Sequence, residues 1–175
     1  MMGMIRKTFT RLDPGLLRSL YLTFIRPFLE FAVPVWSPIL KGDIDMLERV
    51  QHRATRIIPS FRKLKYEDRL KALDLTTLVE RRKRGDMIQV FKIFNGMEKV
   101  ELSEEFSFQH NNTRGHCFKY NKEISRLVHR DNFLLNRSAN YWNALPSKVV
   151  NARTVNSFNA GLDRWMSSNQ ANQLS

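Results

Sequence analysis

Two short sequence patterns contain the side chains from which metal or acid–base sites are made. Asp43 and Asp45 stand one residue apart, as two carboxylates of a divalent-metal site can, and His116 directly precedes Cys117. The four histidines lack metal-ligand spacing, and adjacent His and Cys do not match the paired spacings of structural zinc sites. Asp43 and Asp45 open an amphipathic segment, where acids serve as caps and helix-dipole partners. We therefore predict no metal site and no catalytic residues.

Motifs of common enzyme classes are also absent from the sequence. It contains no Gly-rich phosphate loop, nucleophile elbow or HExxH. The single Cys117 excludes an internal disulfide and a Cys-based zinc site, and it fits a reducing compartment. We predict no cofactor and no turnover by this chain alone.

The sequence shows no secretion signal, so we expect an intracellular protein, nuclear or cytoplasmic, that is not secreted. The N-terminus has no long apolar region before a small-residue cleavage site. The most hydrophobic stretch, residues 20–40, is interrupted by Arg26, Glu30 and three prolines. A membrane span needs roughly 20 mostly apolar residues, so no membrane partner is expected.

Positive charge is the most unusual feature of the sequence. It has 29 Lys and Arg against 17 Asp and Glu, which gives a net charge of +12. Residues 49–84 hold twelve of the cations and four of the acids, a net of +8. Such an excess favours a polyanionic partner. Because a membrane span is not expected, we predict nucleic acid, bound through the phosphate backbone of RNA or an RNA–DNA duplex.

Ten cations are predicted to form the nucleic-acid-binding surface. They are Arg49, Arg53, Arg56, Arg62, Lys63, Lys65, Arg81, Arg82, Lys83 and Arg84. The arginines at 49, 53, 56, 81, 82 and 84 are expected to share one face and to contact phosphates rather than bases, because the planar guanidinium suits phosphate oxygens. The run at 81–84 is expected to be exposed in the first turn of a helix. The alternative interpretation of this run is a solvated helix face.

Helices dominate the predicted architecture, with no sheet of consequence. Asp13-Pro14 predicts a helix start, and Pro27 is expected to kink or end that helix near Arg26. Asp43 is expected to cap a second helix that runs to about Ile58 and stops at Pro59. A short helix is expected around residues 66–73.

A capping box, Thr77-x-x-Glu80, predicts the start of the best-defined helix. Gly96 is its expected C-terminal stop. Periodicity then fades to about residue 130, and two short helices are expected near the end, one around Trp142 and one around Phe158. The predicted fold class is mainly α: a small helical bundle with a short irregular or helical C-terminal extension.

Short motifs follow one another in order through residues 3–166. Among them are Gly3-Met4-Ile5-Arg6-Lys7, Ile25-Arg26-Pro27-Phe28-Leu29-Glu30-Phe31-Ala32, Leu47-Glu48-Arg49-Val50-Gln51, Tyr66-Glu67-Asp68-Arg69-Leu70, Lys92-Ile93-Phe94-Asn95-Gly96 and Trp142-Asn143-x-Leu145-Pro146. In this order they closely resemble the stretch after the polymerase palm in jockey-like non-LTR retrotransposon reverse transcriptases, the RNA-directed DNA polymerases of these transposable elements.

The resemblance implies a thumb domain, whose helices grip the primer–template duplex. It divides the chain into a thumb-like helical region at 1–97, a loop-rich linker at 98–132, a small helical extension at 133–166 and a disordered tail at 167–175. The palm with its catalytic motif and the fingers lie upstream of this region in the family. We therefore expect a truncated fragment that lacks polymerase catalysis, with the missing palm and fingers as possible partners.

Two other functions are compatible with the same sequence. The chain could be a domesticated helical module that binds a protein, with incidental basic charge. It could also be an autonomous enzyme, although no motif supports that. A fragment separated from its palm would also expose Phe24, Phe28, Phe31 and Trp36, and large exposed apolar patches favour self-association.

Overall fold

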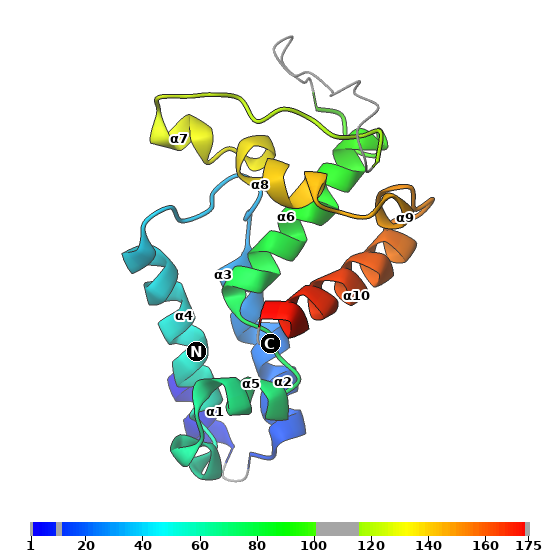
Figure 1. Cartoon of the computed structure of the whole chain (residues 1–175). Coiled ribbons are helices and arrows are strands. Elements are labelled where there is room, and N and C mark those ends of the chain that lie inside the picture. Colours follow the sequence, from blue (N-terminus) through cyan, green and yellow to red (C-terminus); the bar gives the residue numbers. More distant parts are fainter. Residues whose placement is uncertain (1, 10–11, 101–115, 174–175) are drawn as a thin grey trace. The chain divides into compact units, whose positions relative to one another are not determined.

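Helices make up most of the chain in the computed structural model, which describes residues 2–9, 12–100 and 116–173 (Figure 1). No β-strand occurs within these ranges. The chain divides into two compact units, Met1–Arg82 and Lys83–Ser175, and each has its own hydrophobic core. The prediction of a mainly α fold, a small helical bundle with an irregular and helical C-terminal extension, is confirmed.

The first unit consists of short helices and the beginning of a longer one. They are α1 (Met2–Thr8), α2 (Pro14–Leu20), the π-helical turn η1 (Tyr21–Ile25), α3 (Arg26–Glu30), α4 (Lys41–Thr55), the 3-10 turn η2 (Pro59–Lys63), α5 (Tyr66–Ala72) and the start of α6 (Leu78–Phe94). Helix α2 begins as predicted. The Oδ1 atom of Asp13 accepts a hydrogen bond from the Leu16 amide at 2.7 Å, and Pro14 occupies the first turn.

Pro27 does not end its helix at Arg26. The chain passes from α2 through the π-helical turn Tyr21–Ile25 into α3, where Pro27 lies in the first turn. The amide of Arg26 donates to the carbonyl of Tyr21, five residues back. A proline ring clashes with the carbonyl four residues before it. The wider turn accommodates the ring, so the helix continues to Glu30.

Helix α4 differs from the prediction at both ends. It begins at Lys41 after Leu40, so Asp43 lies in the first turn and is not the cap. It ends at Thr55 rather than near Ile58, because Ile58 precedes Pro59 and adopts an extended backbone, with φ −71° and ψ 124°. Ile58 is buried in the core instead of continuing the helix. Helix α5 matches the predicted short helix.

Helices of the first unit bury side chains from one of their faces in its core. Its buried members are Ile5, Leu17, Tyr21, Ile25, Leu29, Ala54, Ile57, Ile58, Phe61, Leu73 and Leu78. Two polar side chains join the helices inside it. Gln51 accepts a hydrogen bond from the hydroxyl of Tyr21 and donates one to the carbonyl of Thr76 at 2.9 Å. These bonds connect α2–η1 to α4 and to the segment before α6.

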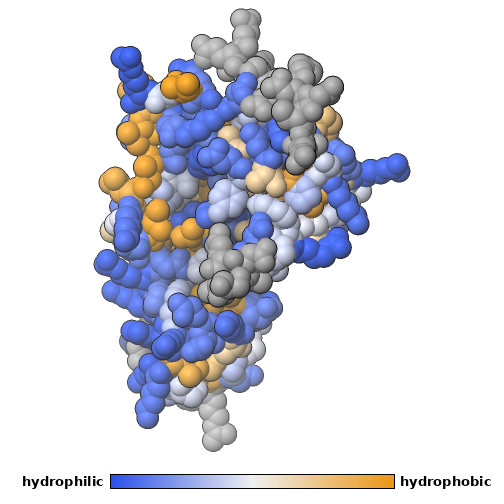
Figure 2. Space-filling view, in the orientation of Figure 1, coloured by the Kyte–Doolittle hydropathy of each residue, from blue (hydrophilic) through white to orange (hydrophobic). Residues whose placement is uncertain are grey.

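Large apolar side chains on η1, α3 and the segment that leads into α4 remain exposed. Phe24, Phe28, Phe31 and Trp36 are 48%, 72%, 75% and 40% exposed, and Val35 is 83% exposed. Figure 2 shows orange side chains gathered beside this segment and blue side chains following along α4. The aromatic side chains expected to be exposed are therefore exposed.

Helix α6 has the ends that the sequence predicts. The amide of Thr77 donates to Oε2 of Glu80 at 3.1 Å, and the amide of Glu80 donates to Oγ1 of Thr77 at 3.2 Å. At the other end, Gly96 adopts φ +64°, and the amide of Met97 donates to the carbonyl of Lys92 at 2.9 Å. This left-handed residue closes the helix as a C-cap glycine does.

In its described residues, the second unit consists of the rest of α6 and four further helices. These are α7 (Val128–Asp131), α8 (Leu134–Asn143), α9 (Ser147–Val150) and α10 (Val155–Gln173). Its core includes Met87, Val90, Phe91, Tyr120, Ala139, Trp142, Leu145, Val149, Val150, Phe158 and Leu162. The rings of Phe91 and Phe158 stack with centroids 4.2 Å apart, which joins α6 to α10.

Two of the expected boundaries differ from those of the structure. The units divide after Arg82 rather than after residue 97, because the later part of α6 packs into the second core. Helix α10 runs to Gln173, so residues 167–173 continue a helix where a disordered tail was expected. Serine, asparagine and glutamine prolong this helix without any apolar periodicity that would mark it. Residues 101–115 of the loop-rich linker expected at 98–132 lie outside the described residues.

Candidate nucleic-acid interface

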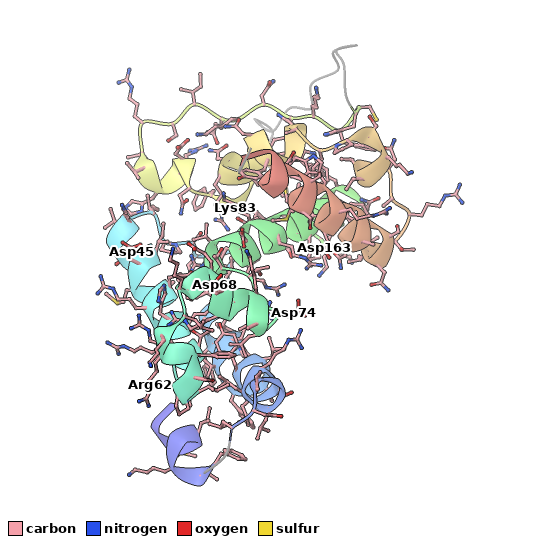
Figure 3. The ribbon with its side chains drawn as sticks, turned by 60° about the horizontal axis from the view of Figure 1, so that its bottom comes forward. Asp45, Arg62, Asp68, Asp74, Lys83 and Asp163 are labelled. Carbon is pink, nitrogen blue, oxygen red and sulfur yellow. The ribbon has the colours of Figure 1, made fainter. Side chains whose placement is uncertain are left out.

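Six of the ten predicted cations form an exposed basic surface on the first unit. Arg49 and Arg53 lie on α4, Arg56 caps its C-terminus, Arg62 and Lys63 lie in η2, and Lys65 caps the N-terminus of α5. All six are exposed. Within the described ranges, none of them forms an ion pair with a carboxylate. We call this set the α4–α5 basic surface; Figure 3 marks Arg62 on its 3-10 turn.

Helical geometry and core packing place these side chains together. Residues 49, 53 and 56 fall within roughly 60° of one another around a helix that turns 100° per residue. Ala54 and Thr55 are buried on the opposite side of α4. Beyond α4, Phe61 anchors the 3-10 turn in the core, so its neighbours Arg62 and Lys63 project outward. Arg49, Arg53 and Arg56 therefore share a face of α4, whereas Arg82, which was predicted to lie on the same surface, is buried.

The run at 81–84, predicted to be exposed, is instead engaged within the protein. Arg81 donates two hydrogen bonds to Glu30, from Nε to Oε1 at 3.0 Å and from Nη2 to Oε2 at 3.1 Å. Arg26 donates to the same Oε1 at 2.8 Å. Burial raises the pKa of Glu30, but the hydrogen bonds from Arg81 and Arg26 outweigh it and leave the pKa below its usual value. The charge of Arg81 is therefore balanced internally.

The other three residues of the run are similarly committed. Arg82 is 5% exposed. The Nζ of Lys83 donates to the hydroxyl of Tyr141 at 2.7 Å and lies 4.7 Å from that ring's centroid. Arg84 donates to both carboxylate oxygens of Asp163, at 2.6 and 3.0 Å; Lys83 and Asp163 are labelled in Figure 3. The expectation of an exposed turn of cations is wrong, because side chains distant in sequence bind Arg81, Lys83 and Arg84 and because Arg82 is buried.

A further cation, Arg69, lies buried beside the basic surface. It is 0% exposed, and its Nη2 donates to Nδ1 of His52 at 3.3 Å. Burial lowers the pKa of His52, and the charges of Arg69 and Arg56 lower it further. A guanidinium has no acceptor, so His52 accepts through Nδ1 and is neutral with its proton on Nε2. The sequence did carry a signal for Arg69, which shares the inward face of α5 with Leu70 and Leu73.

Aromatic stacking and one carboxylate organise the surroundings of Arg69. The rings of His52 and Tyr66 stack with centroids 3.5 Å apart and planes 19° apart. The hydroxyl of Tyr66 donates to Oε1 of Glu48, whose Oε2 accepts from the Leu78 amide at 3.1 Å. Burial and this carboxylate raise the pKa of Tyr66. The cluster thus joins α4, α5 and the start of α6.

Metal-binding and membrane-spanning features are not found in the parts of the chain that the structure describes. No group of three or more His, Cys, Asp or Glu side chains there could hold a metal ion. Asp43 and Asp45 are exposed in the first turns of α4. Of the described helices, none is both long and apolar enough to cross a membrane.

Comparisons with known proteins identify no relative. No protein-family model matches the chain, and neither a curated protein nor a solved structure is significantly similar to it.

Proposed function

We propose that this chain binds nucleic acid through its α4–α5 basic surface and that the ligand's phosphate backbone is the group recognised. The observation that carries the proposal is the set of six exposed cations on consecutive elements, with no ion-pair partner among the described residues. Arginine and lysine in such a set are free to exchange solvent counterions for phosphates. Each phosphate neutralised releases a counterion, which makes binding favourable and salt-dependent.

The geometry of α4 fits contacts to a repeating backbone. Arg49 and Arg56 are seven residues apart, which corresponds to about 10 Å along a helix axis. Their flexible side chains can reach successive phosphates from one helix face. Phosphate contacts orient a protein on its ligand but carry no direct sequence information, so we expect binding that accepts any sequence.

The ordered motifs along the chain favour a particular context for this binding. They resemble the thumb region of jockey-like non-LTR retrotransposon reverse transcriptases, which implies a primer–template duplex as the ligand. We therefore propose that the first unit is a thumb-like element that grips an RNA–DNA heteroduplex. The proposal concerns binding and assigns no catalytic step to this chain.

The test is the salt dependence of binding to a fluorescent RNA–DNA heteroduplex, measured by anisotropy. In the variant Arg49→Ala/Arg53→Ala/Arg56→Ala, up to three phosphate contacts are lost. Each contact contributes about 0.7 to 0.9 to the slope of log K against log salt. The triple variant should therefore lower the slope by about 2 to 3, and its affinity should fall by a similar factor for unrelated sequences.

A control variant removes the same charge from elsewhere. Lys148, Arg153 and Arg164 are exposed on the second unit, and Lys148→Ala/Arg153→Ala/Arg164→Ala also lowers the net charge by three. It should keep a slope near that of the wild type. Equal slopes for the two triple variants would contradict a localised interface. A wild-type slope near zero would contradict nucleic-acid binding itself.

The alternative function, a helical protein-interaction module, is favoured by a different observation. Phe28, Phe31 and Val35 are 72%, 75% and 83% exposed, and exposed apolar patches mark many protein-binding surfaces. Such a module would bind its partner without a steep counterion slope, so the heteroduplex titration separates the two functions.

A further inference from the structure

Arg69 is a buried cation whose charge no carboxylate balances within the described ranges. It is 0% exposed, and its Nε and Nη1 atoms have no hydrogen-bond partner there. Its Nη2 contacts a neutral acceptor, Nδ1 of His52, at 3.3 Å. A buried charge without a partner destabilises a folded protein. This arrangement requires either a structural compensation or a ligand of negative charge.

The neighbours of Arg69 add positive charge rather than removing it. Arg56 is exposed, and its charge acts on both Arg69 and His52. The carboxylate of Glu48 is already occupied by the Tyr66 hydroxyl and the Leu78 amide. The π face of Tyr66 is a weak compensation, since the Arg69 Cζ lies 5.5 Å from the ring centroid.

We propose that Arg69, Arg56 and His52 form a phosphate-binding subsite within the α4–α5 basic surface. The inference rests on the proposed function and names the place where one phosphodiester group of the bound backbone is held. Its chemistry is that of the Arg69 guanidinium, whose planar fork of donors matches two phosphate oxygens, with the positive charge of Arg56 acting on the same place.

The side chain of His52 controls access to this subsite. The Arg69 nitrogens are covered in the conformation described, and His52 is half-buried and held by its stack on Tyr66 and its contact with Arg69. In the proposed bound state, His52 rotates away from Tyr66, which releases Nη2 from its contact with Nδ1 and opens that side of the guanidinium to a phosphate. Arg69 can then donate from Nε and Nη2 to two oxygens of one phosphate, while the exposed Arg56 closes over the anion.

A purely structural role for Arg69 makes the opposite prediction about stability. If Arg69 were needed to hold α4 against α5, Arg69→Met would destabilise the protein in every buffer. If it is an uncompensated cation awaiting an anion, an apolar side chain of similar length should be neutral or stabilising without that anion. The two roles are therefore distinguished before any nucleic acid is added.

The experiment is thermal unfolding of the full chain in potassium phosphate and in potassium chloride of equal ionic strength. Phosphate at ten times its dissociation constant should raise the Tm of the wild type by about 3 to 6 °C. Arg69→Met should lose this rise and keep at least the wild-type Tm in chloride. Arg56→Met, a change at an exposed position, should reduce the rise. Arg164→Met, the control at an exposed arginine of α10 outside the basic surface, should retain it.

Several results would overturn the subsite. The first two are a wild-type Tm that is equal in the two salts and a full phosphate response in Arg69→Met. The others are an equal loss of the response in Arg164→Met and a Tm of Arg69→Met in chloride several degrees below that of the wild type.

Heteroduplex binding distinguishes failure of the subsite from failure of the proposed function. A steep salt slope that Arg69→Met leaves unchanged, with no phosphate response, overturns the subsite and leaves the function standing. A phosphate response that Arg69→Met abolishes, with no heteroduplex binding, supports the anion site and refutes the function.

Discussion

Replacing Asp86 by Asn should destabilise the second unit strongly, because it breaks a buried ion pair. The Nε of Arg137 donates to Oδ2 of Asp86 at 2.9 Å, and its Nη2 donates to Oδ1 at 2.7 Å. The two side chains are only 12% and 9% exposed. Asparagine preserves the shape of Asp86 but removes its charge and one acceptor. The guanidinium of Arg137 would then lose the counter-charge of Asp86 in a buried setting.

The expected magnitude follows from comparison with a second pair of the same chemistry. Arg84 binds both oxygens of Asp163 at 2.6 and 3.0 Å, but the Asp163 side chain is 52% exposed. Breaking a buried pair costs about 3–5 kcal/mol, whereas an exposed pair contributes about 0–1 kcal/mol. Asp86→Asn should therefore lower the free energy of unfolding by at least about 2 kcal/mol more than Asp163→Asn.

The assay is urea unfolding of the full chain, followed by the near-ultraviolet circular dichroism of its tryptophans. Trp142 is buried in the second core and reports on its packing. The slope of free energy against urea should stay constant between variants, so that a shift in midpoint measures stability. Equal losses in the two variants, or a larger loss in Asp163→Asn, would refute the argument from burial.

Two further predictions concern backbone conformation and acid sensitivity. Gly96→Ala should lower the free energy of unfolding by about 1 kcal/mol. Gly96 has φ +64° and a Cβ there would meet no atom within 4 Å, so backbone strain is the whole cost. Urea unfolding measures this loss, and an unchanged stability would contradict the left-handed C-cap. The pKa of Glu30 is lowered in the folded state. Its ionised carboxylate therefore adds to the free energy of unfolding above the usual glutamate pKa of about 4.3, and this stabilisation is lost as pH falls through the lower folded pKa. Glu30→Gln should therefore reduce the Tm at neutral pH and flatten its decline between about pH 5 and 3, and a decline as steep as that of the wild type would exclude this role.

Features fixed by residues close in sequence could be predicted. The Asp13 cap and the Thr77–Glu80 box each depend on hydrogen bonds across three residues. Gly96 has the backbone freedom that a left-handed stop requires. The face of α4 that carries Arg49 and Arg53 follows from helical spacing alone. These local rules establish the mainly α fold and the larger part of the basic surface.

Features that depend on distant partners could not be predicted. Glu30 neutralises Arg81 across 51 positions of sequence, and Asp163 binds Arg84 across 79. Nothing near the 81–84 run indicates that acids elsewhere will reach it. Composition therefore identified the cations but could not separate those that face solvent from those that stabilise the fold. Arg69 differs, because its position on α5 beside Leu70 and Leu73 indicates burial even though a count of charges does not.

The π-helical turn Tyr21–Ile25 has a consequence for how this segment tolerates changes in length. Leu17, Tyr21, Ile25 and Leu29 are all buried at intervals of four residues, a spacing that drifts by 40° per step on a regular α-helix. The wider turn absorbs that drift, as one extra residue accommodated within an α-helix would. Removing Thr23 would restore regular winding and keep Leu29 in register with the buried face, but the ring of Pro27 would then clash with the carbonyl four residues before it. The same deletion in the middle of α4 would rotate every later side chain by about 100°. The extra residue of the π-helical turn thus keeps the buried face in register and also leaves room for Pro27.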